Sequence, residues 1–478
     1  MSYPRKSATI YAAGDHASPE LDWDAMVAFF NGYSASGVFV GPFHYVLSTV
    51  NIGGIDYYYA NNSFQLVYGG PSNAGGVVGT NAYEVFNAVL SSNSRHFVRA
   101  GNYVFSRPID VNTLSNVGIY CEEGTTFQKT AHFAYNIAGC GYPTVLVRDS
   151  ANVVLEGMVI DENSTNQDNL DHYGILSLSS SVKLKDVTIK NPYYCGLVIG
   201  GTNGSTVDMN LCEMYGNVIG ATGCLVYVSQ PTTSKMINVR NSHFHNCTSG
   251  QVLYVNSGNI TVSKCRFENI LNAFDVRTAV TYALLENSTI KDITYDAGAC
   301  PISVDSSGGP VIIQNNKISA CDVDKLIQFQ GSNAKILNNT LVGTSRNYQQ
   351  GIANNPYAAT TDALVQGNKI KDLTGTGAVG LLLGGVSSGS IIDSIIAKNH
   401  IRNVNEHGIL LTNTNGVTHC TFAFNTIRTI PLTAVAISEE APSDYNLFIG
   451  NDHYGLGIEM VGTHSHKNLY WDYTTWTP

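Results

Sequence analysis

A short phrase built around asparagine or another small residue returns along most of the chain, and it restricts the fold more than any other feature. From Val239 onward it appears as RNSHF, KCRF, ENSTI, NNKI, NNTL, GNKI, KNHI, FNTI and GNDH. The phrase recurs every 23 to 31 residues. Its central position is held by Ser242, Cys265, Ser288, Asn316, Asn339, Asn368, Asn399, Asn425 and Asn451. A period of this size is typical of a solenoid of stacked repeats.

Each copy of the phrase lies between two strand-like runs, and many of the earlier runs start with glycine, as in GILSL, GLVIG, GLLLG and GILLT. The units are too short for four-stranded propeller blades, and they lack the LxxLxLxxN frame of leucine-rich repeats. Two or three short strands per unit fit one coil of a parallel β-helix. Asparagine at a fixed place in each coil predicts left-handed corners and side-chain stacking between coils. We therefore interpret the asparagine series as structural.

On these residues the chain resembles the right-handed parallel β-helix proteins of the pectate-lyase-like superfamily, which include bacteriophage tailspike depolymerases. The resemblance implies an all-β solenoid of about 11–13 coils over residues 79–460. The segment TNAYEVFNAVLSS predicts a short amphipathic helix before the first coil. The segment RHFVRAGNYVFSRPIDV that follows is similar to the first strands of that superfamily.

Both ends of the solenoid need a cover, because a terminal coil has no neighbour on one side. An earlier segment, GVFVGPFHYVLSTV, repeats the entry pattern, with Phe39 matching Phe97 and Tyr45 matching Tyr103. We predict that residues 1–78 form an N-terminal cap or attachment domain, and that the aromatic segment 461–478 caps the other end.

Composition excludes several classes of function. Charged residues make up 13% of the chain and the formal net charge is −10, so no broad basic field for nucleic acid exists. No run of 18 apolar residues predicts a membrane span, and the start of the chain lacks the apolar core of a signal peptide. The 10 cysteines include no CxxC pair. We expect them to be reduced and buried, and we expect no metal and no cofactor.

Alternation along the strands turns a group of polar residues outward on three successive coils. The group comprises Asp275, Arg277, Ser303, Asp305, Gln328 and Gln330. Strand spacing places the Cα atoms of Asp275 and Asp305 about 8 Å apart, and carboxyls about 6.5–9.5 Å apart suit inverting glycoside hydrolysis. Arg277 would keep one carboxylate ionised or bind an acidic sugar, and the serine and glutamines would bind sugar hydroxyls. The alternative is an ion pair that joins adjacent coils or subunits.

The same alignment predicts apolar residues on both faces of the earlier coils. It places Leu225, Tyr227, Val252 and Tyr254 inside. It turns Leu176, Leu178, Val198, Val226, Val228, Leu253 and Val255 outward. An apolar outer face needs a cover, either a loop or another subunit. Together with the resemblance, this pattern predicts a homotrimer.

A rival acidic site lies in the segment VIDENSTNQDNLDHYGI. Its candidate residues are Asp161, Glu162, Asp168, Asp171 and His172. Carboxylates with a histidine can serve acid–base chemistry or bind calcium through oxygen atoms. The alternative is a solvated polar turn.

The resemblance implies a carbohydrate-active protein in a virion tail or outside the cell, but the catalytic signatures of the polygalacturonases and the lyase-type RxPxxR are missing. Our leading hypothesis is a tailspike-type depolymerase that hydrolyses a bacterial surface polysaccharide, with Asp275 and Asp305 as acid and base. The alternatives are a polysaccharide lyase, a non-catalytic glycan-binding fibre or adhesin, and an epimerase or fructotransferase.

Overall fold

The structure is a computed structural model that describes residues 45–460 with short gaps. The gaps are 53, 63–77, 134–140, 168–170, 217–222, 232–234, 294–299, 306–308, 355–359, 385–389, 413–415, 429–434, 440–442, 444 and 454–456. Most of the predicted attachment domain, the predicted C-terminal cap at 461–478 and Asp168 lie outside the described residues. The division at residue 78 remains a prediction.

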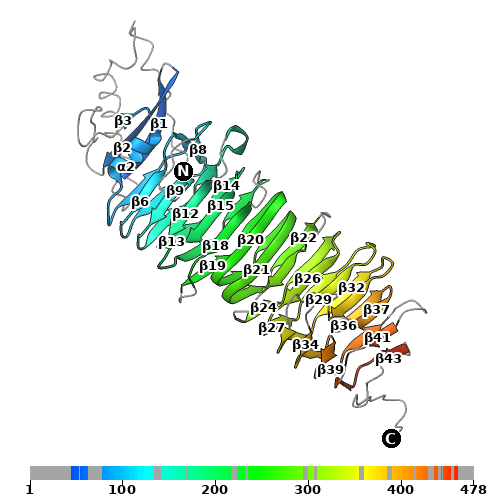
Figure 1. Cartoon of the computed structure of the whole chain (residues 1–478). Coiled ribbons are helices and arrows are strands. Elements are labelled where there is room, and N and C mark those ends of the chain that lie inside the picture. The colour runs from blue at the N-terminus through cyan, green and yellow to red at the C-terminus, as the bar shows by residue number, and fades with distance from the viewer. Residues whose placement is uncertain are drawn as a thin grey trace, which may run out of the picture.

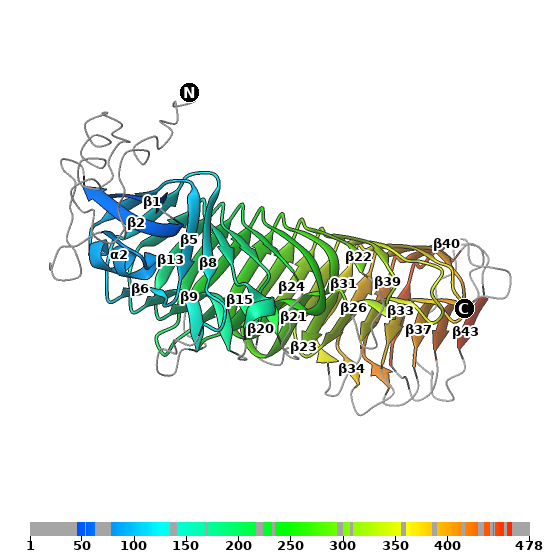
Figure 2. The same ribbon diagram turned by 90° about the horizontal axis from the view of Figure 1, so that it is seen from above.

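The described chain winds into coils that stack along one axis, so the colour in Figure 1 runs steadily from one end to the other. Each coil contributes parallel strands to three faces, and each strand pairs with the strand of the next coil. Figure 2 shows the same stack from above. The arrangement confirms the predicted parallel β-helix.

The first face carries the candidate site described below. Its strands are β6 (Ile109–Asn112), β9 (Tyr142–Arg148), β12 (His172–Leu178), β15 (Cys195–Gly200), β18 (Cys224–Ser229), the middle of β20 (His243–Ser263) and of β21 (Arg266–Glu286), β23 (Ile302–Asp305), β26 (Lys325–Gln330), β29 (Gln350–Asn354), β33 (Val379–Leu383), β37 (His407–Leu411), β41 (Val435–Glu439) and β43 (Gly457–Met460).

The other two faces run along the same stack of coils. The second is built from β4 (Arg95–Val98), β7 (Gly118–Cys121), β10 (Val153–Glu156), β13 (Ser181–Lys185), β16 (Thr206–Asn210), β19 (Met236–Arg240), the ends of β20 and β21, β24 (Val311–Gln314), β27 (Ala334–Leu337), β31 (Leu364–Gln366), β35 (Ile395–Ala397), β39 (Thr421–Ala423) and β42 (Leu447–Ile449). The third is built from β5 (Gly101–Phe105), β8 (Thr125–Lys129), β11 (Val159–Asp161), β14 (Thr188–Lys190), β17 (Glu213–Tyr215), the starts of β20 and β21, β22 (Thr289–Ile293), β25 (Lys317–Cys321), β28 (Thr340–Val342), β32 (Lys369–Leu373), β36 (His400–Val404) and β40 (Thr426–Arg428). A small separate sheet joins β30 (Thr360–Thr361), β34 (Ile391–Ile392) and β38 (Val417–Thr418).

A hairpin and a helix cover the first coil. The hairpin consists of β1 (Tyr45–Ile52) and β2 (Ile55–Asn62); β1 pairs with β4, and β2 pairs with β3 (Val78–Gly79). The predicted helix is confirmed as α2, Ala82–Val89, and its Phe86 ring contacts Tyr103 edge-on. This packing closes the apolar interior at one end. No helix in the described part of the chain has the length and apolarity needed to cross a membrane.

The core column of the first face corrects the predicted alignment. Leu197 pairs with Val226, which pairs with Leu253, which pairs with Phe274. The prediction was wrong by one residue in two coils: Val226, Val228, Leu253 and Val255 lie in the core, at no more than 1% exposure, and Tyr227 and Tyr254 point outward. The segment CLVYVS of β18 has apolar residues at neighbouring positions, so alternation alone cannot choose its inner face.

Near the end of the first face, the repeat pattern predicts that Val435 aligns with Ile409, but backbone pairing puts Ile437 there, a shift of two residues. The one-residue correction reduces the outward apolar residues predicted for the earlier coils to Leu176, Leu178 and Val198, which form a small cluster with Leu146 and Tyr173 outside the main core. The predicted trimer therefore rests on fewer residues and remains a prediction.

The asparagine series forms a continuous buried ladder. The side-chain amide of Asn339 donates to Asn368 Oδ1 at 3.0 Å, and the Asn368 amide donates to Asn399 Oδ1 at 3.0 Å. The Asn368 amide also donates to the Ile336 carbonyl at 2.8 Å. The stacking is confirmed, but the left-handed corner lies one residue earlier, at positions such as Asn338 and Lys398.

Replacing Asn368 by alanine should lower the free energy of unfolding by about 2 kcal/mol, because buried backbone and amide groups lose their partners. The expected result is a lower denaturation midpoint in guanidinium. Asn238 is the control, since it lies on the outer surface of β19, half-buried, and its replacement by alanine should leave the midpoint unchanged. Equal midpoints for both variants would show that the ladder contributes no stability.

The described cysteines form no disulfide, as expected. The Cys195 and Cys224 sulfurs lie 3.3 Å apart on neighbouring coils of the first face. Burial raises the pKa of the Cys212 and Cys265 thiols to about 12. These thiols stay protonated at neutral pH and act as small core side chains.

Candidate functional site

The predicted polar residues meet on the outer side of the first face. Backbone pairing places Asp275 beside Tyr254 on one coil and Ser303 on the next, and pairs Ser303 with Gln328 and Asp305 with Gln330. We call this row of residues the polar strip, and it comprises Tyr227, Tyr254, Asp275, Arg277, Ser303, Asp305, Gln328 and Gln330. The two tyrosines were not predicted as part of it, because the alignment had turned them inward.

Asp275 is the most buried charged group of the polar strip, at 1% exposure. Its Oδ2 atom accepts hydrogen bonds from Gln251 Nε2 at 2.6 Å and from Arg277 Nη2 at 2.9 Å. Its Oδ1 atom is buried and accepts no hydrogen bond from the described residues. Desolvation raises the pKa of Asp275 to about 6, and the charge of Asp305 adds to this rise while Arg277 opposes it. Asp275 thus holds a proton at mildly acidic pH and can donate it.

Aromatic rings flank this acid. Tyr227 and Tyr254 stack with their ring centroids 5.6 Å apart and their planes 18° apart. The Arg277 guanidinium lies over the Tyr254 ring at 5.4 Å from its centroid, and 39% of its side chain is exposed. A cation on an aromatic face beside the Asp275 carboxylate offers a polar ligand a positive charge, a ring surface and hydrogen-bonding groups.

A groove of about 800 Å³ continues the polar strip at the corner where β26 and β29 begin. Its lining residues are Asp322, Asp324, Lys325, Thr344, Ser345, Arg346, Asn347, Tyr348 and Gln350. Lys325 connects the two regions, because its Nζ atom donates to Gln328 Oε1 at 3.2 Å.

The two acidic residues of the groove are held in place by one guanidinium. Arg346 Nη2 lies 2.8 Å from Asp324 Oδ1, and Arg346 Nη1 lies 3.4 Å from Asp322 Oδ1. The Tyr348 side chain is 68% exposed beside them. Sequence reasoning missed this groove because most of its residues come from turns with no repeat, although the run DVDK, which ends at the first residue of β26, is a visible polar signal.

The rival acidic residues do not form one site. Glu162 is fully buried in an ion pair, with its Oε2 atom 2.5 Å from Lys129 Nζ, whereas Asp161 lies near the surface, 3.1 Å from Lys190 Nζ. His172 is also fully buried, and its ring stacks on Tyr142 at 4.9 Å.

The fourth residue of that segment, Asp171, is exposed. The four described residues are thus divided between the interior and the surface. Glu162 can be buried because its charge is paired with that of Lys129, which lies one coil earlier. The sequence analysis did not connect these two residues.

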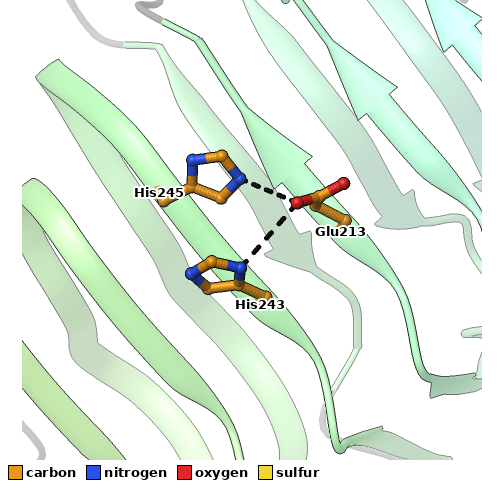
Figure 3. A group of neighbouring side chains, drawn as sticks. All are labelled: Glu213, His243 and His245. Carbon is orange, nitrogen blue, oxygen red and sulfur yellow. Dashed lines mark hydrogen bonds and ion pairs between the residues drawn. The ribbon is translucent and has the colours of Figure 1, made fainter.

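A second cluster, not predicted from the sequence, lies on the third face (Figure 3). Glu213 of β17 faces His243 and His245 of β20, and one ligand atom from each lies within 4.8 Å of the others. Glu213 Oε1 is 2.9 Å from His245 Nε2 and 3.8 Å from His243 Nδ1. The HxH spacing was the visible signal, since it turns both rings to the same side of a strand.

The comparisons with known proteins agree with this fold. Residues 173–341 match the family model described as right handed beta helix region. A mutant tailspike protein of E. coli bacteriophage HK620, solved in complex with a pentasaccharide, has a TM-score of 0.55 at 10% identity, covering 83% of this chain and 76% of that chain. The chain therefore has the right-handed parallel β-helix fold.

Two other solved structures match the chain with lower scores. The surface adhesin PfbA of Streptococcus pneumoniae has a TM-score of 0.47 at 12% identity, covering 74% of this chain and 88% of that chain. The A-module of an Azotobacter vinelandii mannuronan C-5 epimerase has a TM-score of 0.41 at 12% identity, covering 79% of this chain and 96% of that chain. Among curated proteins, no sequence matches the chain significantly.

Proposed function

We propose that this protein binds a bacterial surface polysaccharide along its first face and hydrolyses it, as a tailspike-type depolymerase outside the cell or on a virion tail. The observation that carries the proposal is the polar strip, in which Asp275 and Asp305 lie beside the stacked pair of Tyr227 and Tyr254. An elongated row of this kind, continued by the groove, matches an extended chain of sugar rings. A homotrimer remains part of the proposal.

The binding side of the proposal rests on the chemistry of the strip. Tyrosine rings offer flat apolar faces against which the C–H faces of sugar rings pack, and the face of Tyr254 that Arg277 covers opens when Arg277 turns toward the substrate. The amides of Gln328 and Gln330 and the hydroxyl of Ser303 can exchange hydrogen bonds with sugar hydroxyls. Arg277 can bind a sugar carboxylate through two parallel hydrogen bonds, so we favour an acidic polysaccharide.

The catalytic side rests on the two aspartates. Asp275, with its pKa raised to about 6, is the proton donor, and Asp305 is the base that activates water from the opposite side. Asp275 Oδ1 is buried, and Oδ2 accepts from Arg277 and Gln251, so the reaction requires Arg277 to turn toward the substrate and free Oδ2. Loss of that cation would raise the pKa of Asp275 further and keep its proton in place.

Burial of Asp275 also favours a second function, a fibre or adhesin that binds glycans without cleaving them. In that case Asp275 and Arg277 form a structural ion pair, which is the alternative given in the sequence analysis. The binding surface would be unchanged, and only the chemistry would be lost.

Product analysis decides between these functions. The protein is incubated with a panel of capsular and lipopolysaccharide glycans, and new reducing ends and product masses are measured. Products that have gained one water per cut support the hydrolase. An ultraviolet-absorbing unsaturated product would indicate a lyase, isomerised or cyclised products would indicate an epimerase or fructotransferase, and binding without any product would indicate the adhesin.

Replacing Tyr254 or Tyr227 by alanine should weaken glycan binding about tenfold each, because each change removes one stacking surface worth about 1–1.5 kcal/mol. The measurement is calorimetry or biolayer interferometry with the glycan identified in the panel. Tyr445 is the matched control, an exposed tyrosine near the C-terminal end of the coils, stacked on His419. An unchanged affinity in both strip variants would move the glycan surface elsewhere.

A further inference from the structure

The Glu213, His243 and His245 cluster is built like a metal site. Its three side chains come from neighbouring coils of the third face, because Glu213 pairs with His243 across β17 and β20. They meet on the outer surface, with all three side chains half-buried (Figure 3). Two imidazoles and one carboxylate on one side of an ion leave coordination positions open, an arrangement that proteins use for transition metals.

A fourth residue, Glu268, orients the His243 ring of the cluster. The Glu268 carboxylate lies 3.0 Å from His243 Nε2 and is itself held by Arg266 Nη2 at 2.6 Å and Lys291 Nζ at 2.5 Å. As an ionised acceptor, Glu268 accepts a hydrogen bond from the Nε2–H group of His243. A histidine bound in this way by a carboxylate presents its other nitrogen to a metal, as in the carboxylate–histidine–zinc arrangement.

The hydrogen bond to Glu268 leaves two acceptor atoms facing each other, one on His243 and one on Glu213. When Nε2 donates to Glu268, the Nδ1 atom of His243 faces Glu213 Oε1 as an acceptor, 3.8 Å away. Ligand atoms bound to tetrahedral zinc at about 2.0–2.1 Å lie roughly 3.4 Å apart. The two spacings from Glu213 Oε1, 2.9 Å to His245 and 3.8 Å to His243, lie on either side of that value. A cation between these groups would join two lone pairs that otherwise repel.

We propose that Glu213, His243 and His245 bind one divalent transition-metal ion of the zinc class, with Glu268 as the positioning residue. The site lies on a different face from the polar strip and is independent of the proposed glycan chemistry. Because its ligands belong to successive coils, the bound ion would stabilise the stack at this point.

The test is zinc titration of the full chain after removal of any polyhistidine tag. We expect one zinc ion per chain by calorimetry and a higher thermal midpoint in its presence. Cobalt(II) added in place of zinc should give visible absorption bands of a low-coordinate site. Replacement H245Q or E213Q should weaken zinc binding about tenfold or more, and E268Q by a smaller factor.

His400 supplies the matched control, because it is a half-buried histidine on β36 of the same third face and lies outside the cluster. H400Q should leave zinc affinity unchanged. The proposal is overturned if the wild-type chain binds no zinc, if H245Q and E213Q bind it as tightly as the wild type, or if H400Q weakens binding equally. Circular dichroism of each variant confirms that the coils are intact, since these side chains lie outside the core.

Discussion

Replacing Glu162 by glutamine should lower the free energy of unfolding by about 3–5 kcal/mol, because the change leaves a buried ammonium group without its counter-charge. Lys129 Nζ is enclosed by three acceptors: Glu162 Oε2 at 2.5 Å, the Tyr142 carbonyl at 2.6 Å and the Tyr173 carbonyl at 3.0 Å. Both charged side chains are fully buried. The measurement is a guanidinium denaturation curve of each protein.

The pH dependence of this variant has a definite sign. Burial lowers the pKa of Lys129 below its ordinary value, and the attraction of Glu162 opposes that change. In the variant this attraction is gone, so the folded-state pKa of Lys129 falls further below the unfolded value of about 10.4. The unfolded chain then binds more protons, and the variant should regain stability as the pH rises from the lowered pKa toward about 10.

Two further variants separate charge from packing. The double replacement of Lys129 by methionine and Glu162 by leucine removes both charges and should be more stable than the single variant, since no charge remains buried. The exposed pair of Lys185 and Glu156 on the second face is the control, and E156Q should not move the midpoint. A Glu162 variant as stable as the wild type would mean that water reaches Lys129.

The period of the asparagine phrase was sufficient to predict the coils, because each copy marks the same corner of the stack. Strand alternation also placed Asp275, Ser303 and Gln328 correctly, since Phe274 and Val276 are unambiguous inward residues between polar neighbours. Alternation failed at Tyr227 and Tyr254, where apolar residues occupy consecutive positions and only backbone pairing selects the face.

The other sites depend on neighbours that no local pattern connects. Glu213 reaches His243 only because one coil stacks on the next, and the chain between them varies in length from coil to coil. Lys129 and Glu162 meet by the same stacking. The groove is formed by Arg346 and the acids around it, in turns whose conformations no repeat determines. Side chains in turns are therefore the part of a solenoid that its period leaves unpredicted.

Replacing Asp275 by asparagine should reduce hydrolysis at least a hundredfold while glycan binding is retained, if the proposed function holds. Asparagine keeps the size of the side chain and a hydrogen-bond acceptor but cannot donate an acidic proton, and general acid catalysis contributes about 10²–10⁴-fold. Replacing Asp305 by asparagine should reduce hydrolysis to a similar extent, because the change removes the base that activates water. The measurement is the rate of reducing-end release, and Asp208, an exposed aspartate paired with Arg240 on the second face, supplies the matched control D208N.

The pH profile tests the same assignment without a mutation. Only protonated Asp275 can act as the acid, so kcat/KM, which reports the free enzyme, should fall as the pH rises through about 6. If Arg277 turns to the substrate, Asp275 loses its neighbouring cation in the complex, and the corresponding fall in kcat should occur at higher pH. If kcat and kcat/KM fall at the same pH, Arg277 remains bound to Asp275 in the complex. Full activity of D275N and D305N would leave the polar strip as a binding surface alone.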